Sequence, residues 1–330
     1  MPIKATGIRW HLAVPPEVST EYVGTKLGDY YSRADIMLRT QLEARERFRS
    51  LYGVDIGGPH VAVPAYVGVA ALGAELVLPY DHAPMVANQG RVLPDEHSVL
   101  ALEPAEPEAS IWLQEYLSIR EKLAQSLGYY PNMGAGQEGP ITSAVLLRGS
   151  HFYVDLLDNP VVAHHLLAVV TETYIRFVRY IRRVNGRAEQ DGVGIADDMA
   201  GTISPAMWPE FVIPYWERIY RELGPGPRSV HTELLHRDHL RYLKEMDIAS
   251  YDPGNDQYLT VHDVVAELGD MDFSWNLYTV RDMLEGTPES IKALYTEAVA
   301  AGARHIMTEL CRGIARKNVH AFVAVARQYE

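Results

Sequence analysis

The feature that most constrains the fold is an alternation of short apolar segments and amphipathic helices along the second half of the chain. Its spacing predicts strands at 192–196, 228–231, 247–251, 272–275 and 305–308. Between and after them it predicts helices at 207–223, 237–245, 260–268, 288–301 and 318–328. Regular alternation of this kind indicates parallel βαβ units. Because no glycine-rich dinucleotide fingerprint follows the first strand, a closed barrel is favoured over a Rossmann sheet.

The sequence therefore predicts an α/β protein with the fold of a (β/α)8 TIM barrel and an N-terminal helical extension. Residues 22–52 show helical spacing, with Ile36, Leu38 and Phe48 among many charged residues. We expect one barrel domain over residues 1–330, with residues 1–55 packed on it as the extension. A further amphipathic helix is predicted over 161–184.

Charge and cysteine content exclude several classes of protein. The 330 residues carry a formal net charge of −13, and an acidic surface of this kind repels nucleic acid. The single cysteine allows no intramolecular disulfide, which fits a reducing compartment. No secretory signal and no apolar run of membrane-spanning length is apparent, so we expect a cytoplasmic protein that binds neither nucleic acid nor membrane.

Polar side chains follow each of the predicted strands at the point where the strand ends. In chain order they are Asp197 and Asp198, His231 and Glu233, Asp252, Asn276, and Glu309 with Cys311. In a parallel barrel the carboxyl ends of the strands surround one mouth, and active sites are built there. The recurrence of such residues at equivalent places predicts a site at this mouth.

Three of these residues suggest a metal centre. His231 and Glu233 are two positions apart, so on an extended segment both point to one side. Cys311 reaches the same mouth if the barrel closes. An imidazole, a carboxylate and a thiolate form a plausible zinc site with one open position. A structural interpretation stands beside this one, because a lone cysteine is usually a small buried hydrophobe and Asp-Asp often caps a helix.

Five segments resemble the uroporphyrinogen decarboxylase superfamily, over roughly residues 55–330. They are GPITSAVLLRG (139–149), DNPVVAHHLLAVVTE (158–172), IADDMAGTISPAMWPEFVIPYWERI (195–219), NLYTVRDMLEGTPESIKAL (276–294) and ELCRGIARKNVHAFVAVARQY (309–329). The resemblance implies a (β/α)8 barrel and one of two chemistries. One branch decarboxylates porphyrinogens, and the other comprises zinc-dependent methyltransferases that work with corrinoid proteins.

The resemblance favours the methyltransferase branch. Decarboxylases of the family grip the substrate carboxylates with an arginine-rich N-terminal motif, whereas this chain has only Arg9 before Arg33. The methyltransferases carry His-x-Cys and a later Cys as zinc ligands. His231 and Cys311 match the first and last of these ligands, and Glu233 stands in place of the middle one. That departure makes the expected zinc ion harder and puts a thiol substrate in doubt.

The predicted function is methyl transfer between a small substrate and a corrinoid, methylcobalamin, on a partner protein, or a thiol acceptor. Zinc on His231, Glu233 and Cys311 would activate the substrate heteroatom. Catalytic roles are expected for Asp197 and Asp198. The expected substrate-binding residues are Gln137, Asp252, Asn276 and Glu309. A homodimer is possible. The alternatives are a metal-free lyase that uses Asp198 as its polarising acid, and a non-catalytic barrel that binds a corrinoid or small ligand.

Overall fold

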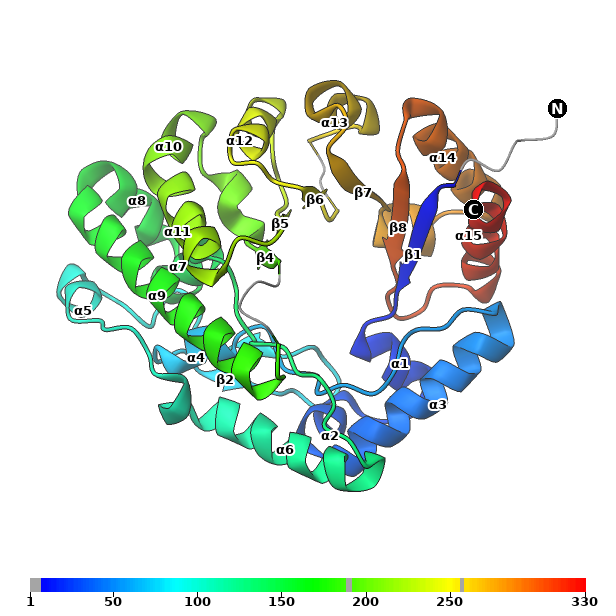
Figure 1. Cartoon of the computed structure of the whole chain (residues 1–330), viewed down its shortest axis with the longest axis horizontal. Coiled ribbons are helices and arrows are strands. Elements are labelled where there is room, and N and C mark those ends of the chain that lie inside the picture. The colour runs from blue at the N-terminus through cyan, green and yellow to red at the C-terminus, as the bar shows by residue number, and fades with distance from the viewer. Residues whose placement is uncertain (1–6, 188–191, 256–257) are drawn as a thin grey trace.

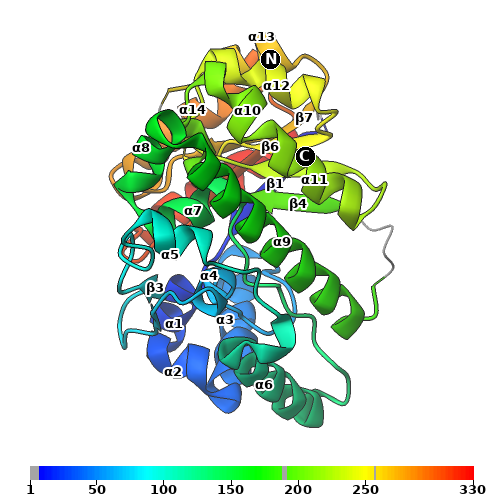
Figure 2. The same cartoon turned by 90° about the vertical axis from the view of Figure 1, so that its left-hand side faces the viewer.

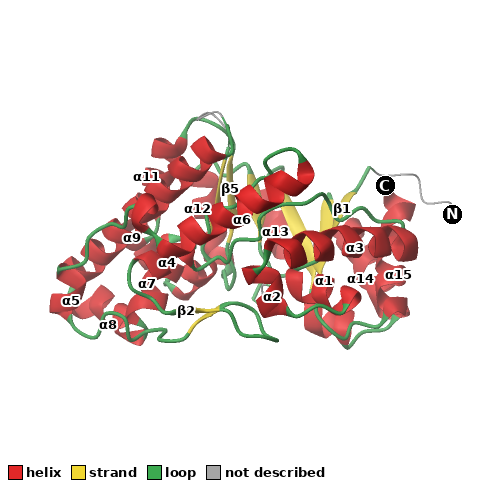
Figure 3. Cartoon of the chain, turned by 90° about the horizontal axis from the view of Figure 1, so that it is seen from below, coloured by secondary structure: helices red, strands yellow, loops and turns green. Residues whose placement is uncertain are grey.

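Six parallel strands form the main sheet of the protein. The computed structural model describes residues 7–187, 192–255 and 258–330. The strands lie in the order β1-β8-β7-β6-β5-β4, and each neighbouring pair is parallel. Their bounds are β1 (Arg9–Ala13), β4 (Val193–Ala196), β5 (Arg228–His231), β6 (Ser250–Asp252), β7 (Asp272–Leu277) and β8 (His305–Glu309). Seen from below, these strands occupy the centre and the helices surround them (Figure 3).

The remaining two strand positions of the barrel are irregular. A single parallel bridge joins Val61 to Met133, and the Val61 amide donates to the Asn132 carbonyl at 2.8 Å. The loop after Met133 reaches β4, where the Gly139 amide donates to the Ala196 carbonyl at 2.5 Å. The predicted (β/α)8 TIM barrel is confirmed. Six of its strands are regular, and the stretches at Val61 and after Asn132 occupy the two remaining strand positions. A separate antiparallel ribbon pairs β2 (Leu76–Val77) with β3 (Met85–Val86).

The helices pack around the outside of the sheet (Figure 1). Their bounds are α1 (Pro16–Val23), α2 (Leu27–Ser32), α3 (Ala34–Tyr52), α4 (Val67–Ala71), α5 (Glu96–Leu100), α6 (Ile111–Leu127), α7 (Pro140–Arg148), α8 (Ser150–Asp158), α9 (Pro160–Val184), α10 (Trp208–Phe211), α11 (Ile213–Leu223), α12 (Leu240–Glu245), α13 (Val261–Leu268), α14 (Pro288–Ala301) and α15 (Arg316–Tyr329). Short 3-10 turns cover Pro107–Ala109 (η1), Asp198–Thr202 (η2), Pro205–Met207 (η3) and Arg237–His239 (η4), and a π-helical turn covers Thr279–Leu284 (η5).

Local sequence explains where several of these helices begin and end. Thr260 and Thr287 each cap a helix, because their hydroxyls accept the amides of Asp263 and Ser290 at 3.2 Å. Pro288 then occupies the first turn of α14, where its missing amide costs nothing, and Gly302 ends that helix with φ of 109°.

The N-terminal region differs from the prediction in one respect. Helices α1, α2 and α3 fill most of residues 1–55, but Arg9–Ala13 forms β1 and pairs with β8 inside the barrel sheet. This stretch is therefore not only an extension, and residues 1–6 lie outside the described part. A strand of five residues with a single buried position gave too short an alternation to be recognised. Trp10 on β1 faces outward, with its ring 6.2 Å from that of Phe322 on α15.

The register of the sheet assigns one side of each strand to the barrel interior. Outward residues such as Val230, Tyr251 and Ile306 are buried beneath the helices. The residues between them point inward because successive side chains alternate. Two sets of residues in register on this inward side are polar: Ser229 with Ser250, and Ser274 with His305, whose Oγ and Nδ1 atoms are 2.9 Å apart. The interior below the mouth is thus polar.

Helix α9 is the longest helix and crosses the side of the molecule that faces the viewer in Figure 2. By length and apolar composition it would pass as a membrane span, with a mean hydropathy of 1.2 over its best window. Within the fold, however, 61% of that window is buried against other elements. Its packing is that of a core helix.

We predict that Gly139→Ala destabilises the protein. A Cβ atom at Gly139 would lie 2.4 Å from the Cβ of buried Asp197, so the loop must move away from β4. Overpacking of this kind costs roughly 1–3 kcal/mol of unfolding free energy, measurable by urea denaturation. The matched control is Gly134→Ala in the same loop, where a Cβ meets nothing within 4 Å. Equal stability of the two variants would contradict the packing described here.

Candidate functional site

Four of the predicted side chains form a continuous chain of contacts across the mouth of the barrel. The His231 ring, at the end of β5, lies between Asp198 (Nε2 to Oδ1, 3.2 Å) and Asp252 (Nδ1 to Oδ2, 3.1 Å). Asn276, buried at the end of β7, donates from Nδ2 to the Asp252 Oδ1 at 2.8 Å. These residues come from the ends of neighbouring strands, as the sequence predicts. The site therefore begins as an imidazole held between two carboxylates.

The two carboxylates set the charge of the histidine. Burial opposes a charged ring, but hydrogen bonds and charges from Asp198 and Asp252 outweigh it and raise the pKa of His231 to about 10. Burial likewise opposes ionisation of Asp252, yet His231 and the Gly254 amide hold the pKa of that carboxyl below its usual range. At neutral pH the His231 ring is therefore an imidazolium that lies between the carboxylates of Asp198 and Asp252, and the three side chains together carry a net negative charge.

A fifth residue, Glu138, belongs to the site although the sequence did not single it out. Burial raises its pKa to about 8, with the charges of Asp198 and Asp197 adding to the effect and that of His231 opposing it. Its Oε2 atom is buried and makes no hydrogen bond within the described residues. Glu138 is therefore a neutral carboxylic acid at pH 7. The available signal was an acidic residue in a glycine-rich loop, directly before Gly139-Pro140 at the start of α7.

Asp197 occupies a different environment from its neighbour Asp198. It is fully buried and accepts four hydrogen bonds, from the backbone amides of Ile141 and Thr142, the Thr142 hydroxyl, and the Trp216 indole N–H. Burial nevertheless raises its pKa to about 6. A carboxylate whose oxygens are occupied in this way holds the start of α7 against β4. The geometry favours a positioning role for Asp197 over the catalytic role that the sequence predicts.

Glu233 follows His231 on the loop after β5. Its Oε1 atom accepts the Asn255 amide at 3.0 Å, and the side chain packs over Gly254, where a Cβ would lie 2.4 Å from the same oxygen. That hypothetical atom would also lie 2.9 Å from the Cε1 of His231, so Glu233 and His231 both contact this glycine. The next residue, Leu234, has a φ of 61°, which is strained for a branched side chain and makes the loop turn sharply.

Glu309, the last residue of β8, and Cys311, just after it, lie on the other side of the mouth. The charged neighbours that act on Cys311 are Glu21 and Glu309, and burial together with these charges raises the pKa of its thiol. Glu309 is closer to the centre. Desolvation and the charge of Glu17 raise its pKa, while His231 lowers it. Cys311 is therefore a protonated thiol beside α1 at neutral pH.

The three predicted zinc ligands do not form a ligand set in this arrangement. Both ring nitrogens of His231 face carboxylates, and Glu233 accepts a backbone amide. Within residues 7–187, 192–255 and 258–330, no three His, Cys, Asp or Glu side chains are grouped as a metal ion requires. The donor geometry of these three side chains therefore does not fit zinc.

Gln137, predicted to bind substrate, points away from this cluster. Its side chain packs on Gly68 of α4, where a Cβ would lie 2.1 Å from its Oε1, and its Nε2 donates to the Ala135 carbonyl at 3.2 Å. Glu138, the next residue along the loop, faces Asp198 and His231 instead. Of these two adjacent residues, Gln137 thus packs on α4 and Glu138 belongs to the cluster at the mouth.

The mouth is acidic. Asp198, Asp252, Glu233 and Glu309 surround His231, and His231 is the one cation among the main influences on the pKa values of Glu138 and Glu309. The nearby Arg312 is occupied by backbone oxygens, donating to the carbonyls of Asp81 at 2.6 Å and Glu17 at 3.2 Å. A site of this charge attracts cations or neutral molecules and repels polycarboxylates.

Comparisons with known proteins agree with this barrel. Residues 7–329 match the family model described as uroporphyrinogen decarboxylase (URO-D). Among curated proteins, uroporphyrinogen decarboxylase of Mycobacterium bovis is 28% identical over 164 residues, which cover 48% of this chain and 43% of that enzyme. The enzyme of Xanthomonas euvesicatoria is 38% identical over 78 residues, or 24% of this chain and 21% of that enzyme. The matched regions thus span less than half the length of these relatives.

Among solved structures, a methyltransferase from Methanosarcina mazei matches with a TM-score of 0.67 at 17% sequence identity. The match covers 99% of this chain and 95% of that one, and at this identity it shows a shared fold. The match to the family model extends over nearly all of the described barrel, from β1 to α15. The chain belongs to the uroporphyrinogen decarboxylase family.

Proposed function

We propose that this protein is an enzyme that transfers a methyl group from a heteroatom of a small, neutral or cationic substrate. The observation that carries the proposal is the composition of the mouth, where carboxyl groups surround a single imidazolium. A porphyrinogen with several carboxylates would meet like charges on every side, and unpaired like charges are costly to bring together. The charge of the mouth thus supports the methyltransferase branch over the decarboxylase branch.

Glu138 supplies the general acid. When a methyl group leaves a heteroatom, the carbon–heteroatom bond breaks and its electron pair stays on the heteroatom. Because Glu138 is neutral at pH 7, its proton can pass to that atom as the acceptor's nucleophile forms the new bond to the methyl carbon. The resulting carboxylate then regains a proton from water. Protonation makes the departing group a better leaving group.

Asp198 and His231 position the substrate around this acid. The side chain of Asp198 is 42% exposed, so one edge of the carboxylate can accept a hydrogen bond from an N–H or O–H group of the substrate. Asp252 and Asn276 fix the orientation of the His231 ring from behind. Glu309 lies at the rim, where a cationic group of the substrate would lower the repulsion among the carboxylates.

The methyl acceptor is also part of the proposal. A corrinoid, methylcobalamin in its methylated form, carried by a partner protein is the acceptor that the methyltransferase branch suggests, and a thiol is the alternative. The nucleophile would enter through the mouth, since Glu138 and His231 lie at the carboxyl ends of the strands. The zinc ion predicted on His231, Glu233 and Cys311 takes no part in the reaction as proposed. This zinc site stays a prediction, because His231 and Glu233 would first have to leave their present partners.

A second candidate is decarboxylation without a metal. It is favoured by the mycobacterial relatives, which are named as decarboxylases, and by Glu138, since a neutral acid can also protonate the carbon that loses carbon dioxide. Incubation with uroporphyrinogen, followed by fluorescence detection of oxidised products, separates the two functions. Formation of coproporphyrinogen would overturn the methyl-transfer proposal.

We predict that Glu138→Gln lowers the rate of methyl transfer by roughly 10²–10⁴-fold, the usual contribution of a general acid. The assay is the methylation of free cob(I)alamin from a panel of methanol, methylamines and methoxybenzenes, followed by absorbance. The exposed Glu108→Gln serves as the control for the charge change. A Glu138→Gln variant with the rate of the wild type would remove Glu138 from the mechanism.

The same residue predicts a pH dependence. Its pKa is raised to about 8, so the acid is protonated below that pH and loses its proton as the pH rises through it. The wild-type rate should therefore fall above about pH 8, whereas the residual rate of Glu138→Gln should not fall over the same pH range. An equal fall in rate in both enzymes would assign the pH dependence to another titratable group.

Elemental analysis tests the metal site separately. Because the three side chains are not assembled around one point, we expect purification without chelator to give less than one zinc per chain. For the same reason, Cys311→Ser and Glu233→Ala should leave the zinc content unchanged. One zinc per chain in the wild type, lost in both variants, would instead restore the ligand set that the sequence predicts.

A further inference from the structure

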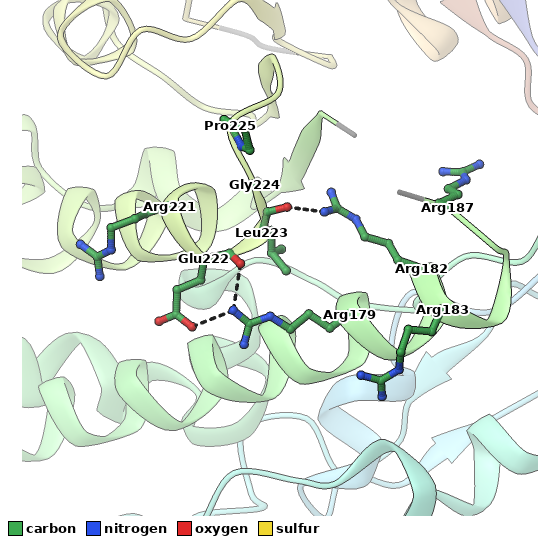
Figure 4. Close-up of a pocket in the computed structure, with 9 residues that line it drawn as sticks. All are labelled: Arg179, Arg182, Arg183, Arg187, Arg221, Glu222, Leu223, Gly224 and Pro225. Atoms are coloured by element: carbon green, nitrogen blue, oxygen red, sulfur yellow. Dashed lines mark hydrogen bonds and ion pairs between the residues drawn. The ribbon is translucent and has the colours of Figure 1, made fainter. Parts of the chain in front are cut away.

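A pocket at the opposite end of the barrel gathers an unusual number of arginines. Its volume is about 350 Å³, and it lies where the last turns of α9 and α11 approach each other (Figure 4). Its lining is Arg179, Arg182, Arg183, Arg187, Arg221, Glu222, Leu223, Gly224 and Pro225. Five positive side chains around one cavity stand out in a chain with a net charge of −13.

The topology places this pocket away from the acidic mouth. Helix α9 leads into the start of β4, and α11 leads into the start of β5. The pocket therefore lies at the amino ends of the strands, whereas His231 and Glu138 lie at the carboxyl ends. In barrels of this kind the two ends are separated by the full length of the strands. A ligand bound here would not compete with a substrate at the mouth.

Two of the arginines have a structural role that explains their presence. Arg179 donates from Nη2 to the Glu222 carbonyl at 2.8 Å, and Arg182 donates to the carbonyl oxygens of Leu223 and, at 3.0 Å, Gly192. Cations that bind the free carbonyls at the end of a helix also favour the negative end of its dipole. These two residues hold the end of α11 against α9.

The other three arginines are not explained in this way. Within the described residues the side chains of Arg187 and Arg221 make no hydrogen bond or ion pair, and the Arg183 guanidinium lies over the Tyr180 ring at 5.7 Å. Figure 4 shows Arg179 and Arg182 hydrogen-bonded to the end of α11, whereas Arg183, Arg187 and Arg221 have no marked interaction and extend in different directions. These three exposed guanidinium groups therefore keep donors available for an anion at the pocket.

We propose that this arginine pocket binds a small anion with more than one phosphate group. Guanidinium groups match phosphate oxygens with paired hydrogen bonds, and several of them are needed to balance a polyphosphate. The volume suits a small molecule. A nucleic-acid strand is disfavoured, because it would extend beyond the pocket onto a protein of strongly negative charge.

Isothermal titration calorimetry with inorganic tripolyphosphate at low ionic strength tests the proposal on the full chain. The expected result is saturable binding of one molecule per chain, weakened about tenfold in the Arg183→Gln/Arg221→Gln double variant. The matched control is Arg47→Gln/Arg316→Gln, which removes the same charge from exposed positions elsewhere. The targeted arginines lie in the last turns of α9 and α11 but their side chains donate no hydrogen bond to a helix end, so thermal unfolding of both double variants should resemble that of the wild type.

Several results would overturn the proposal. They are the absence of saturable binding, equal weakening in the two double variants, or tighter binding of a single-stranded oligonucleotide than of tripolyphosphate. Equal weakening would mean that tripolyphosphate senses only the net charge of the protein. The result is independent of the proposed methyl transfer, because the calorimetric readout requires no turnover.

Discussion

The hydrogen bonds to the buried carboxylate of Asp197 are the constraint from which the geometry of the mouth follows. One side chain at the end of β4 accepts two amides from the first turn of α7 and the indole N–H of Trp216 on α11. This pins the loop that carries Glu138 to the strand that carries Asp198. A carboxylate buried at this depth without hydrogen bonds would be strongly destabilising. The packing of β4, α7 and α11 against one another therefore depends on these hydrogen bonds.

Three carboxyl groups within a few residues of this point behave differently because their surroundings differ. Asp197 is saturated with donors, Asp198 is half exposed beside a cation, and Glu138 is buried beside anions with an unpaired oxygen. Separation of acids by environment is a common way for one site to hold a proton donor and a charged partner together. The inward-facing serines below the mouth leave this cluster in a polar surrounding and not in an apolar core.

The sequence predicted the part of the fold in which pattern and period agree. The strands that carry His231, Asp252 and Asn276 at or next to their last residue were found because apolar runs there alternate with helices, and their ends were expected to meet. Glu138 was missed because a loop acid has no periodic signal, and its importance depends on a neighbour 60 residues later, Asp198. The described residues do not show Cys311 in a metal-binding group with His231 and Glu233, for a related reason. Strand order places a residue at the correct end of the barrel, but loop direction decides which neighbours it meets.

The position of β1 has a consequence for how the protein is made. Arg9 is in register with His305, 296 residues later (305 − 9), so the first strand finds its partner only after that long stretch has left the ribosome. Until then its backbone groups lack their partner strand, and its outward Trp10 lacks the contact with Phe322 of α15. Contacts of such long sequence separation slow folding and expose chains to aggregation. Synthesis of this barrel should therefore benefit from chaperones that shield the nascent amino-terminal segment until β8 emerges.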